Sequence, residues 1–113
     1  MSRGFINDMS GGFISDIVAE ADIPDEGTLS RVLFKQDAVR LVVFAFDAGQ
    51  ELTEHMASVP AIVQVVTGSL SVTVGGEEHH MTPASWLYLP AGEPHSVRAD
   101  AASRMLLTMI RCP

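Results

Sequence analysis

The chain has 113 residues, of which 47% are hydrophobic and 19% charged, and its net charge is −7. This length and composition predict one folded domain rather than a disordered chain. The seven Lys and Arg residues are scattered, and no apolar run approaches about 18 residues. We therefore expect no nucleic-acid partner and no membrane partner.

Residues 1–28 are predicted to form an N-terminal arm and connector, because Gly, Ser and Asp dominate there. Four apolar side chains interrupt this polar stretch: Phe5, Ile6, Phe13 and Ile14. We expect them to pack on a neighbouring subunit. Cys112 has no second cysteine to pair with, and no basic and apolar leader opens the chain, so a cytoplasmic location is expected.

Residues 29–113 are predicted to form the β domain, either a sandwich or a barrel. Short runs that alternate or are rich in β-branched residues are separated by turn signals. The expected strands cover residues 29–34, 39–46, 60–66, 70–74, 77–81, 86–89, 95–99 and 104–110. No run in this region has the 3.6-residue period of a helix. Several short strands with regular turns indicate an all-β sandwich or barrel.

Two histidines stand out by their local context. His95 follows Pro90, Gly92 and Pro94, so a rigid turn places its side chain at the start of a strand. His55 follows a comparable turn, and we expect the two imidazoles to face one cavity. His79 and His80 follow a hairpin and are adjacent, so they would point to opposite faces and could not chelate one ion together.

The spacing around His55 resembles the first motif of the cupin family. That motif runs from a glycine through two histidines and a glutamate to a closing glycine. Gly49, His55 and Gly68 match it in this chain. Ala57 stands where the second histidine would be, and Ala61 where the glutamate would be.

The spacing around His95 resembles the second cupin motif. Pro90, Gly92 and His95 match, whereas Ala84 replaces its first glycine and Ala99 its asparagine. The chain is thus similar to a small single-domain cupin of the RmlC-like type with a degenerate metal motif. The resemblance implies the cupin double-stranded β-helix, a jelly-roll-like antiparallel barrel.

In the family, the two histidines and the glutamate of the first motif, with the histidine of the second, hold a divalent metal. Only His55 and His95 remain of that set. Two imidazoles are a poor site for Zn, Fe, Mn or Ni, which usually take three or more protein ligands. We therefore expect no tightly bound metal.

The other candidates for the pocket are Gln64, Met56, Trp86 and Tyr88. Gln64 is the polar residue in an apolar run, but strand alternation puts it on the face opposite Ala61. Only a bulge would turn Gln64 toward the cavity. Otherwise its amide is satisfied by backbone or at a subunit interface. The further apolar wall candidates are Phe44 or Phe46, Val59, Met105, Leu107 and Met109.

The predicted function is small-molecule binding in an apolar barrel pocket anchored by His55 and His95, without a named ligand. Two alternatives stay open: a metal-dependent dioxygenase or isomerase, and a non-catalytic assembly module. The sequence does not distinguish imidazoles that only bind a ligand from imidazoles that act as general acid and base. A homodimer is expected in each case, since the run at residues 61–66 is apolar on both faces.

Overall fold

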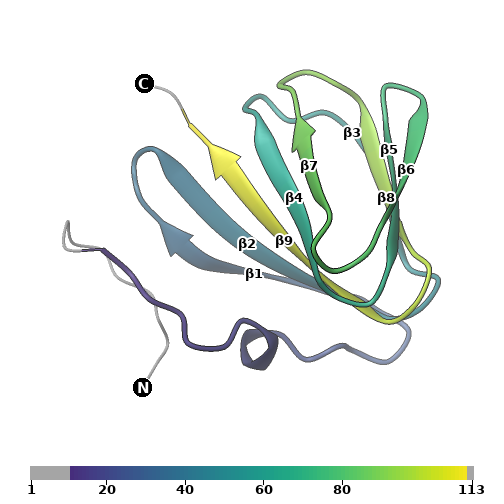
Figure 1. Ribbon diagram of the computed structural model, residues 1–113, viewed down its shortest axis with the longest axis horizontal. Helices are drawn as coiled ribbons and strands as arrows, with labels where there is room; N and C mark the ends of the chain where they lie inside the picture. The colour runs from purple at the N-terminus through teal and green to yellow at the C-terminus, as the bar shows by residue number, and fades with distance from the viewer. Residues whose placement is uncertain (1–10, 112–113) are drawn as a thin grey trace.

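The computed structural model describes residues 11–111, and at His55 it describes the backbone. This part of the chain contains nine strands and one short 3-10 helix, η1 (Val18–Glu20) (Figure 1). The strands are β1 (Thr28–Lys35), β2 (Val39–Phe46), β3 (Glu51–His55), β4 (Ala61–Thr67), β5 (Leu70–Val74), β6 (Glu77–Met81), β7 (Trp86–Leu89), β8 (His95–Ala99) and β9 (Ser103–Ile110). No helix among the described residues is long and apolar enough to cross a membrane.

The strands form two antiparallel sheets that pack face to face. One sheet has the order β1-β2-β9-β4-β7 and the other the order β3-β8-β5-β6 (Figure 1). Most neighbouring strands in each sheet are distant in sequence, which shows that the chain passes repeatedly from one sheet to the other, as in a jelly roll. The predicted all-β, jelly-roll-like antiparallel fold is confirmed.

The strand β3 (Glu51–His55) was not predicted. Its sequence, ELTEH, has few of the β-branched and aromatic residues that favour strands, and its described side chains are mostly exposed. Pairing with β8 nevertheless orders it, with a register shift between Leu52 and His55. His55 therefore ends a strand, although its sequence context placed it near the start of one.

The main core lies between the two sheets. In β4, Ala61, Val63 and Val65 point inward and are at most 5% exposed, whereas the residues between them are partly exposed. This alternation is the one expected for a strand with one face on the core. The buried members of the core are Phe46, Ala61, Val63, Val65, Leu70, Val72, Met81, Leu89, Val97, Ala99 and Met105.

The N-terminal segment packs on the outer face of the five-stranded sheet. Ile14, Ile17, Ala21 and Ile23 join a second apolar cluster with outward side chains of β1, β2 and β9. The guanidinium of Arg104 donates from Nε to the carbonyl of Ala21 at 2.7 Å. Ile14, which was expected to pack on a neighbouring subunit, is partly buried against its own sheet.

The remaining apolar residues of the arm have different outcomes. Phe13 is 75% exposed, so its ring is available to a partner. Phe5 and Ile6 lie outside the described residues.

Candidate functional site

The turn before β8 holds His95 in a buried position. Gly92 has φ +80, which a glycine adopts without strain, and its amide donates to the carbonyl of Ala57 at 2.8 Å. His95 is 6% exposed, and its Nδ1 lies 3.2 Å from the carbonyl oxygen of Glu93. The turn thus aims the imidazole into the interior, as its sequence predicted.

His95 borders a small cavity between the sheets, with a volume of about 30 Å³. Its lining residues are Phe44, Leu52, Val63, Leu89, His95, Val97, Met105 and Leu107. Among the lining residues whose side chains the structure describes, the imidazole is the sole ionisable group. Of the expected wall residues, Phe44, Met105 and Leu107 are present, whereas Phe46, Val59 and Met109 are not among the lining residues. Leu52, Val63, Leu89 and Val97 were not singled out, since nothing in the sequence distinguishes them from ordinary core residues.

His55 lies on the strand next to His95. The backbone register of β3 and β8 places the two residues directly opposite each other. They are therefore neighbours within the four-stranded sheet, and any site that they share would lie on this sheet.

The comparison with known families is decisive for the fold. Residues 42–111, well over half of the chain, match the family described as Cupin domain. The chain belongs to the cupin family. None of the curated proteins matches it.

Solved structures share this architecture over most of the chain. A conserved protein of unknown function from Streptococcus pyogenes has 28% identity and a TM-score of 0.83, with 96% of each chain covered. A cupin superfamily protein from Desulfitobacterium hafniense has 18% identity and a TM-score of 0.81, covering 88% of this chain and 92% of the other. KdgF from Halomonas sp. has 23% identity and a TM-score of 0.75, covering 86% and 94%.

The donor set of this cupin does not fit a divalent metal. Ala61 faces inward and is 2% exposed, so a methyl group stands where the family glutamate would lie. The side chain of Ala57 offers no donor either. Among residues 11–111, the ring of His55 apart, no three His, Cys, Asp or Glu side chains converge. No chemical step can be assigned to a metal with these residues.

Gln64 does not line the cavity. The pairing of β4 with β7 is regular from Ala61 to Gln64, and the register shift with β9 comes later, between Val65 and Thr67. No bulge therefore turns Gln64 inward, and it lies on the outer face of the sheet. Its placement in the pocket is corrected, whereas its position opposite Ala61 follows the expected alternation.

Trp86, Tyr88 and Met56 do not line the cavity either. Trp86 is 60%, Tyr88 47% and Met56 64% exposed. In β7 it is Leu87 and Leu89 that pack toward the core, so the two aromatic rings point outward. Sequence alternation gave two possible phases for this short strand, and only its pairing with β4 decides between them.

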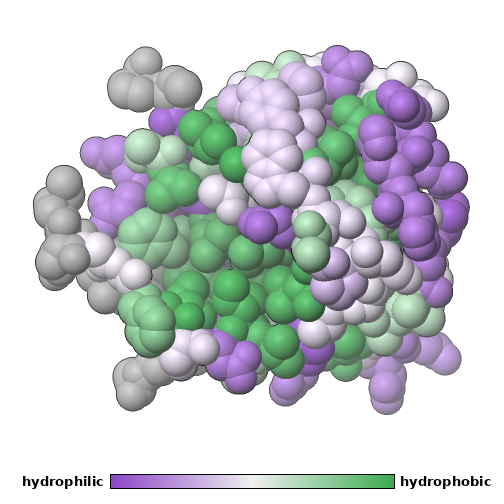
Figure 2. All heavy atoms as spheres, in the orientation of Figure 1, coloured by the Kyte–Doolittle hydropathy of each residue, from purple (hydrophilic) through white to green (hydrophobic). Residues whose placement is uncertain are grey.

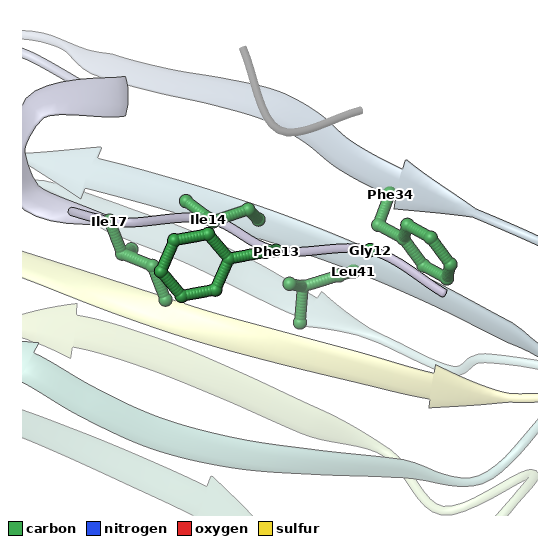
Figure 3. Close-up of a pocket in the computed structure, with 6 residues that line it drawn as sticks. All are labelled: Gly12, Phe13, Ile14, Ile17, Phe34 and Leu41. Carbon is green, nitrogen blue, oxygen red and sulfur yellow. The ribbon is translucent and has the colours of Figure 1, made fainter. Parts of the chain in front are cut away.

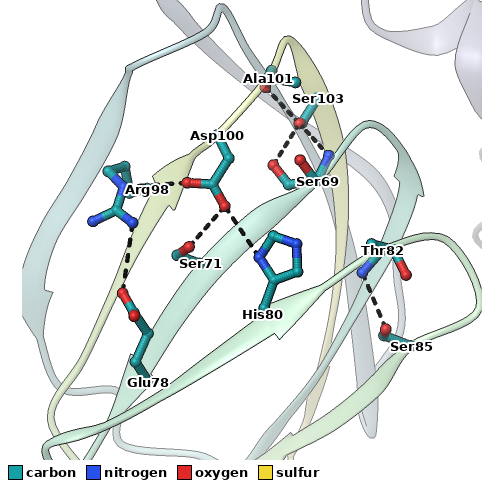
Figure 4. A network of polar contacts seen from close by, with 10 residues as sticks. All are labelled: Ser69, Ser71, Glu78, His80, Thr82, Ser85, Arg98, Asp100, Ala101 and Ser103. Carbon is teal, nitrogen blue, oxygen red and sulfur yellow. Dashed lines mark hydrogen bonds and ion pairs between the residues drawn. The ribbon is translucent and has the colours of Figure 1, made fainter.

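A polar network covers the outer face of the four-stranded sheet (Figure 4). Ser71 Oγ donates to Asp100 Oδ2 at 2.7 Å, and Arg98 Nε donates to Asp100 Oδ1 at 3.2 Å. His80 Nδ1 lies 3.4 Å from Asp100 Oδ2, and Arg98 also approaches Glu78 at 3.6 Å. This cluster is on the opposite side of the sheet from the cavity.

The hydrogen bond from Ser71 is the largest influence on the Asp100 carboxyl and lowers its pKa, with smaller contributions from Arg98 and His80. Partial desolvation opposes this shift. A lowered pKa in the folded state contributes stability at pH values above the ordinary pKa of an aspartate. That stability is lost as the pH falls through the folded-state value.

Asp100→Asn is expected to lower the free energy of unfolding by about 1 kcal/mol at pH 7. The deficit should shrink as the pH falls below about 4, the ordinary aspartate pKa, and on through the lowered pKa of the folded state, because the wild-type carboxylate is then protonated. Urea unfolding at pH 7, 5, 4 and 3 measures this trend. Asp37→Asn, in the exposed β1–β2 hairpin, is the matched control and should follow the wild type. A deficit that stays constant with pH would contradict the assignment.

Proposed function

We propose that this cupin binds a small, largely apolar molecule in the barrel cavity, with His95 as the polar contact that orients it. The observation that supports this is the buried imidazole in an otherwise apolar lining. Small-molecule sites combine apolar walls with a few placed polar groups. A neutral imidazole has one donor and one acceptor nitrogen, and a proton on Nδ1, which is directed at the Glu93 carbonyl, makes Nε2 the acceptor.

The size of the cavity limits the ligand. About 30 Å³ is the share of one water molecule in the liquid, and drug-sized ligands need about 300 Å³ or more. Binding therefore requires side chains of the wall to turn aside. Phe44, Leu52 and Leu107 are only partly buried, so they can move toward solvent at the least cost. A ligand of one ring or less suits this space.

A metal-dependent dioxygenase or isomerase is the weaker candidate. Such an enzyme would need donors beyond His55 and His95, and the side chains at positions 57 and 61 supply none. The binding proposal needs no metal. Addition of EDTA should therefore leave the affinity for the ligand unchanged.

Removing the imidazole should weaken binding without unfolding the domain. Phenol, benzoate and cyclohexanol are the probes, and methyl-labelled methionine is the NMR reporter. Met105 lines the cavity, whereas Met56 is 64% exposed and serves as an internal control. We expect a saturable shift of the Met105 methyl group and none at Met56. His95→Ala should weaken the affinity about 3- to 10-fold, the value of one hydrogen bond.

His80→Ala is the matched control, since this histidine is on the outer face of the sheet. It should bind like the wild type. If no probe causes a saturable change in the chemical shift of the Met105 methyl group in the folded protein, the barrel is not the binding site. If His95→Ala binds the probes as tightly as His80→Ala does, the proposed role of the imidazole is wrong.

A further inference from the structure

Arg40 carries a hydrogen-bond donor for which the described part of the chain supplies no acceptor. Its Nε atom is buried, and no described residue accepts a hydrogen bond from it. Removing a charged donor from water without giving it an acceptor is unfavourable, so such groups are rare in native proteins. A ligand from outside the chain is one explanation for them. The position of Arg40 indicates which ligand could reach it.

Strand alternation directs Arg40 toward the inner face of the five-stranded sheet. The adjacent Leu41 belongs to the outer apolar cluster, and it lines a hollow there with Phe13 of the arm (Figure 3). Phe44, which alternation places on the same face as Arg40, packs against the main core. The pairing of β2 with β9 is regular along the whole of β2, so no bulge interrupts the alternation. Arg40 is therefore on the face that borders the cavity.

Arg40 lies in a row of side chains that crosses the sheet at the edge of the cavity. It pairs with Met109 of β9, Met109 pairs with Ala61 of β4, and Ala61 pairs with Leu89 of β7. Leu89 lines the cavity, as does Leu107, which precedes Met109 on the same face of β9. A ligand that extends from the cavity across Met109 therefore reaches the guanidinium of Arg40.

The inner face is open to solvent beside Arg40. Val32 of β1 pairs with Val42 of β2 on this face, and Val32 is 45% exposed. The four-stranded sheet thus leaves the inner side of β1 uncovered, and Figure 1 shows β1 and β2 extending away from that sheet. A ligand can enter along β2 and pass Arg40 before it reaches the cavity.

Two further cations lie at this entrance. Lys35 of β1 pairs directly with Arg40, and Arg111 follows the end of β9, where its amide donates to the carbonyl of Ala38 at 2.9 Å. Neither of them, nor Arg40, forms an ion pair with a described residue. The three positive charges therefore lie at the same end of three adjacent strands, where an anion can meet them.

The other described cations, Arg31, Arg98 and Arg104, each have an acidic side chain or a carbonyl oxygen as a partner. The net charge of the chain is −7, so an entrance with three cations that lack a described acidic partner differs from the rest of the surface. Figure 2 shows hydrophilic atoms around the β1–β2 hairpin, at the left of the view, and again toward β5 and β6, with hydrophobic atoms over the five-stranded sheet between them. A local excess of positive charge attracts anionic ligands.

The chemistry of Arg40 favours a carboxylate. A guanidinium presents Nε and one Nη as two parallel donors, and the two oxygens of a carboxylate can accept from both. The buried Nε of Arg40 is one half of such a pair. A phosphate group carries about two negative charges, and a single guanidinium leaves much of that charge without a donor. The small cavity, about 30 Å³, also suits a ligand with one small apolar body.

We propose that the ligand of this cupin is a small monocarboxylate. Its apolar body enters the cavity beside His95, its carboxylate accepts from Nε and one Nη of Arg40, and Lys35 and Arg111 attract it to the entrance. This specificity rests on the proposed binding in the barrel, whereas the binding of a carboxylate by Arg40 can be measured by itself.

Benzoate and benzamide test the carboxylate, because they have nearly the same shape but differ in charge. With the Met105 methyl group as reporter, the wild type should bind benzoate at least about 10-fold more tightly than benzamide, the value of a charge-assisted hydrogen bond. Arg40→Gln should remove this preference and change the affinity for benzamide less than about 2-fold. Arg40→Lys keeps the charge but lacks the paired donors, so it should retain only part of the preference.

Arg98→Gln is the matched control. It removes the same charge from the outer face of the four-stranded sheet, and it should leave the preference for benzoate unchanged. Equal losses in Arg40→Gln and Arg98→Gln, or a wild type that does not distinguish benzoate from benzamide, would refute the role of Arg40. Tighter binding of inorganic phosphate than of benzoate would also overturn the proposal, because the entrance would then be a phosphate site.

The Nε–H resonance of Arg40 distinguishes the carboxylate site from the binding function itself. Benzoate should shift this resonance saturably in the folded, isotope-labelled wild type, whereas sodium chloride at equal ionic strength should not, and its loss in Arg40→Lys assigns it. A shift of Arg40 without Met105 would support the carboxylate site and overturn binding in the barrel. A shift of Met105 without Arg40 would support the binding function and refute the carboxylate site. No shift of either would refute both.

Discussion

Gly68→Ala is expected to destabilise the domain by roughly 3–5 kcal/mol. Gly68 has φ +89, where an alanine is strained. In addition, a Cβ atom at this position would collide with the side chain of Ser103 and the carbonyl of Ala102. Ser103 is fully buried and cannot move aside, because its hydroxyl accepts from the Ser69 amide at 2.9 Å and lies within donating distance of the carbonyls of Ala101, at 2.6 Å, and Ser69, at 3.0 Å.

Gly49→Ala separates backbone strain from collision. Gly49 has φ +85, but no atom lies within 4 Å of the position of an added Cβ. We expect a loss of about 1–2 kcal/mol from the backbone conformation alone. Urea unfolding of both variants gives the comparison. Equal losses would mean that the loop at Ser103 relaxes and that the buried hydroxyl does not fix it.

These two glycines show why the family spacing predicted the fold. Both match the first cupin motif, and both occupy positive φ at a turn, so the backbone conformation itself requires them. The turn before His95 is similar, since Gly92 also has positive φ. Local conformational requirements of this kind are visible in a single sequence.

The orientation of strands was less predictable. The inward position of Ala61 follows from alternation and the cupin motif, and its 2% exposure confirms it. The short strand β7 has too few residues to show which face is buried, and its register depends on β4, which is distant in sequence. Trp86 and Tyr88 were therefore expected in the pocket, although they point outward.

The pocket also depends on contacts that no local pattern reveals. Strand β3 is ordered by its pairing with β8, so Leu52 reaches the cavity from a stretch that resembles a loop. The arm settles on the outer face through Arg104, which is 83 residues from Ala21 in the chain. The sequence identified His95, but the size of the space beside it depends on how both sheets pack.

Phe46→Ala is expected to lower the free energy of unfolding by about 3–5 kcal/mol. Phe46 is fully buried between the sheets, and its ring stacks on that of Phe44 at 6.0 Å between centroids. Truncation removes the buried ring and leaves a void that the closely packed neighbours cannot fill. Urea unfolding monitored by circular dichroism measures the loss.

Phe44→Ala is the matched control, because Phe44 is the stacking partner but is only partly buried and lines the cavity. We expect about half of the loss, about 2 kcal/mol, since less apolar area leaves water and the neighbouring space already exists. The interior would then be tightly packed at Phe46 and more easily rearranged at Phe44. Equal losses would mean that Phe44 is packed as tightly as Phe46, and its ring would then be too rigidly held to move aside for a ligand.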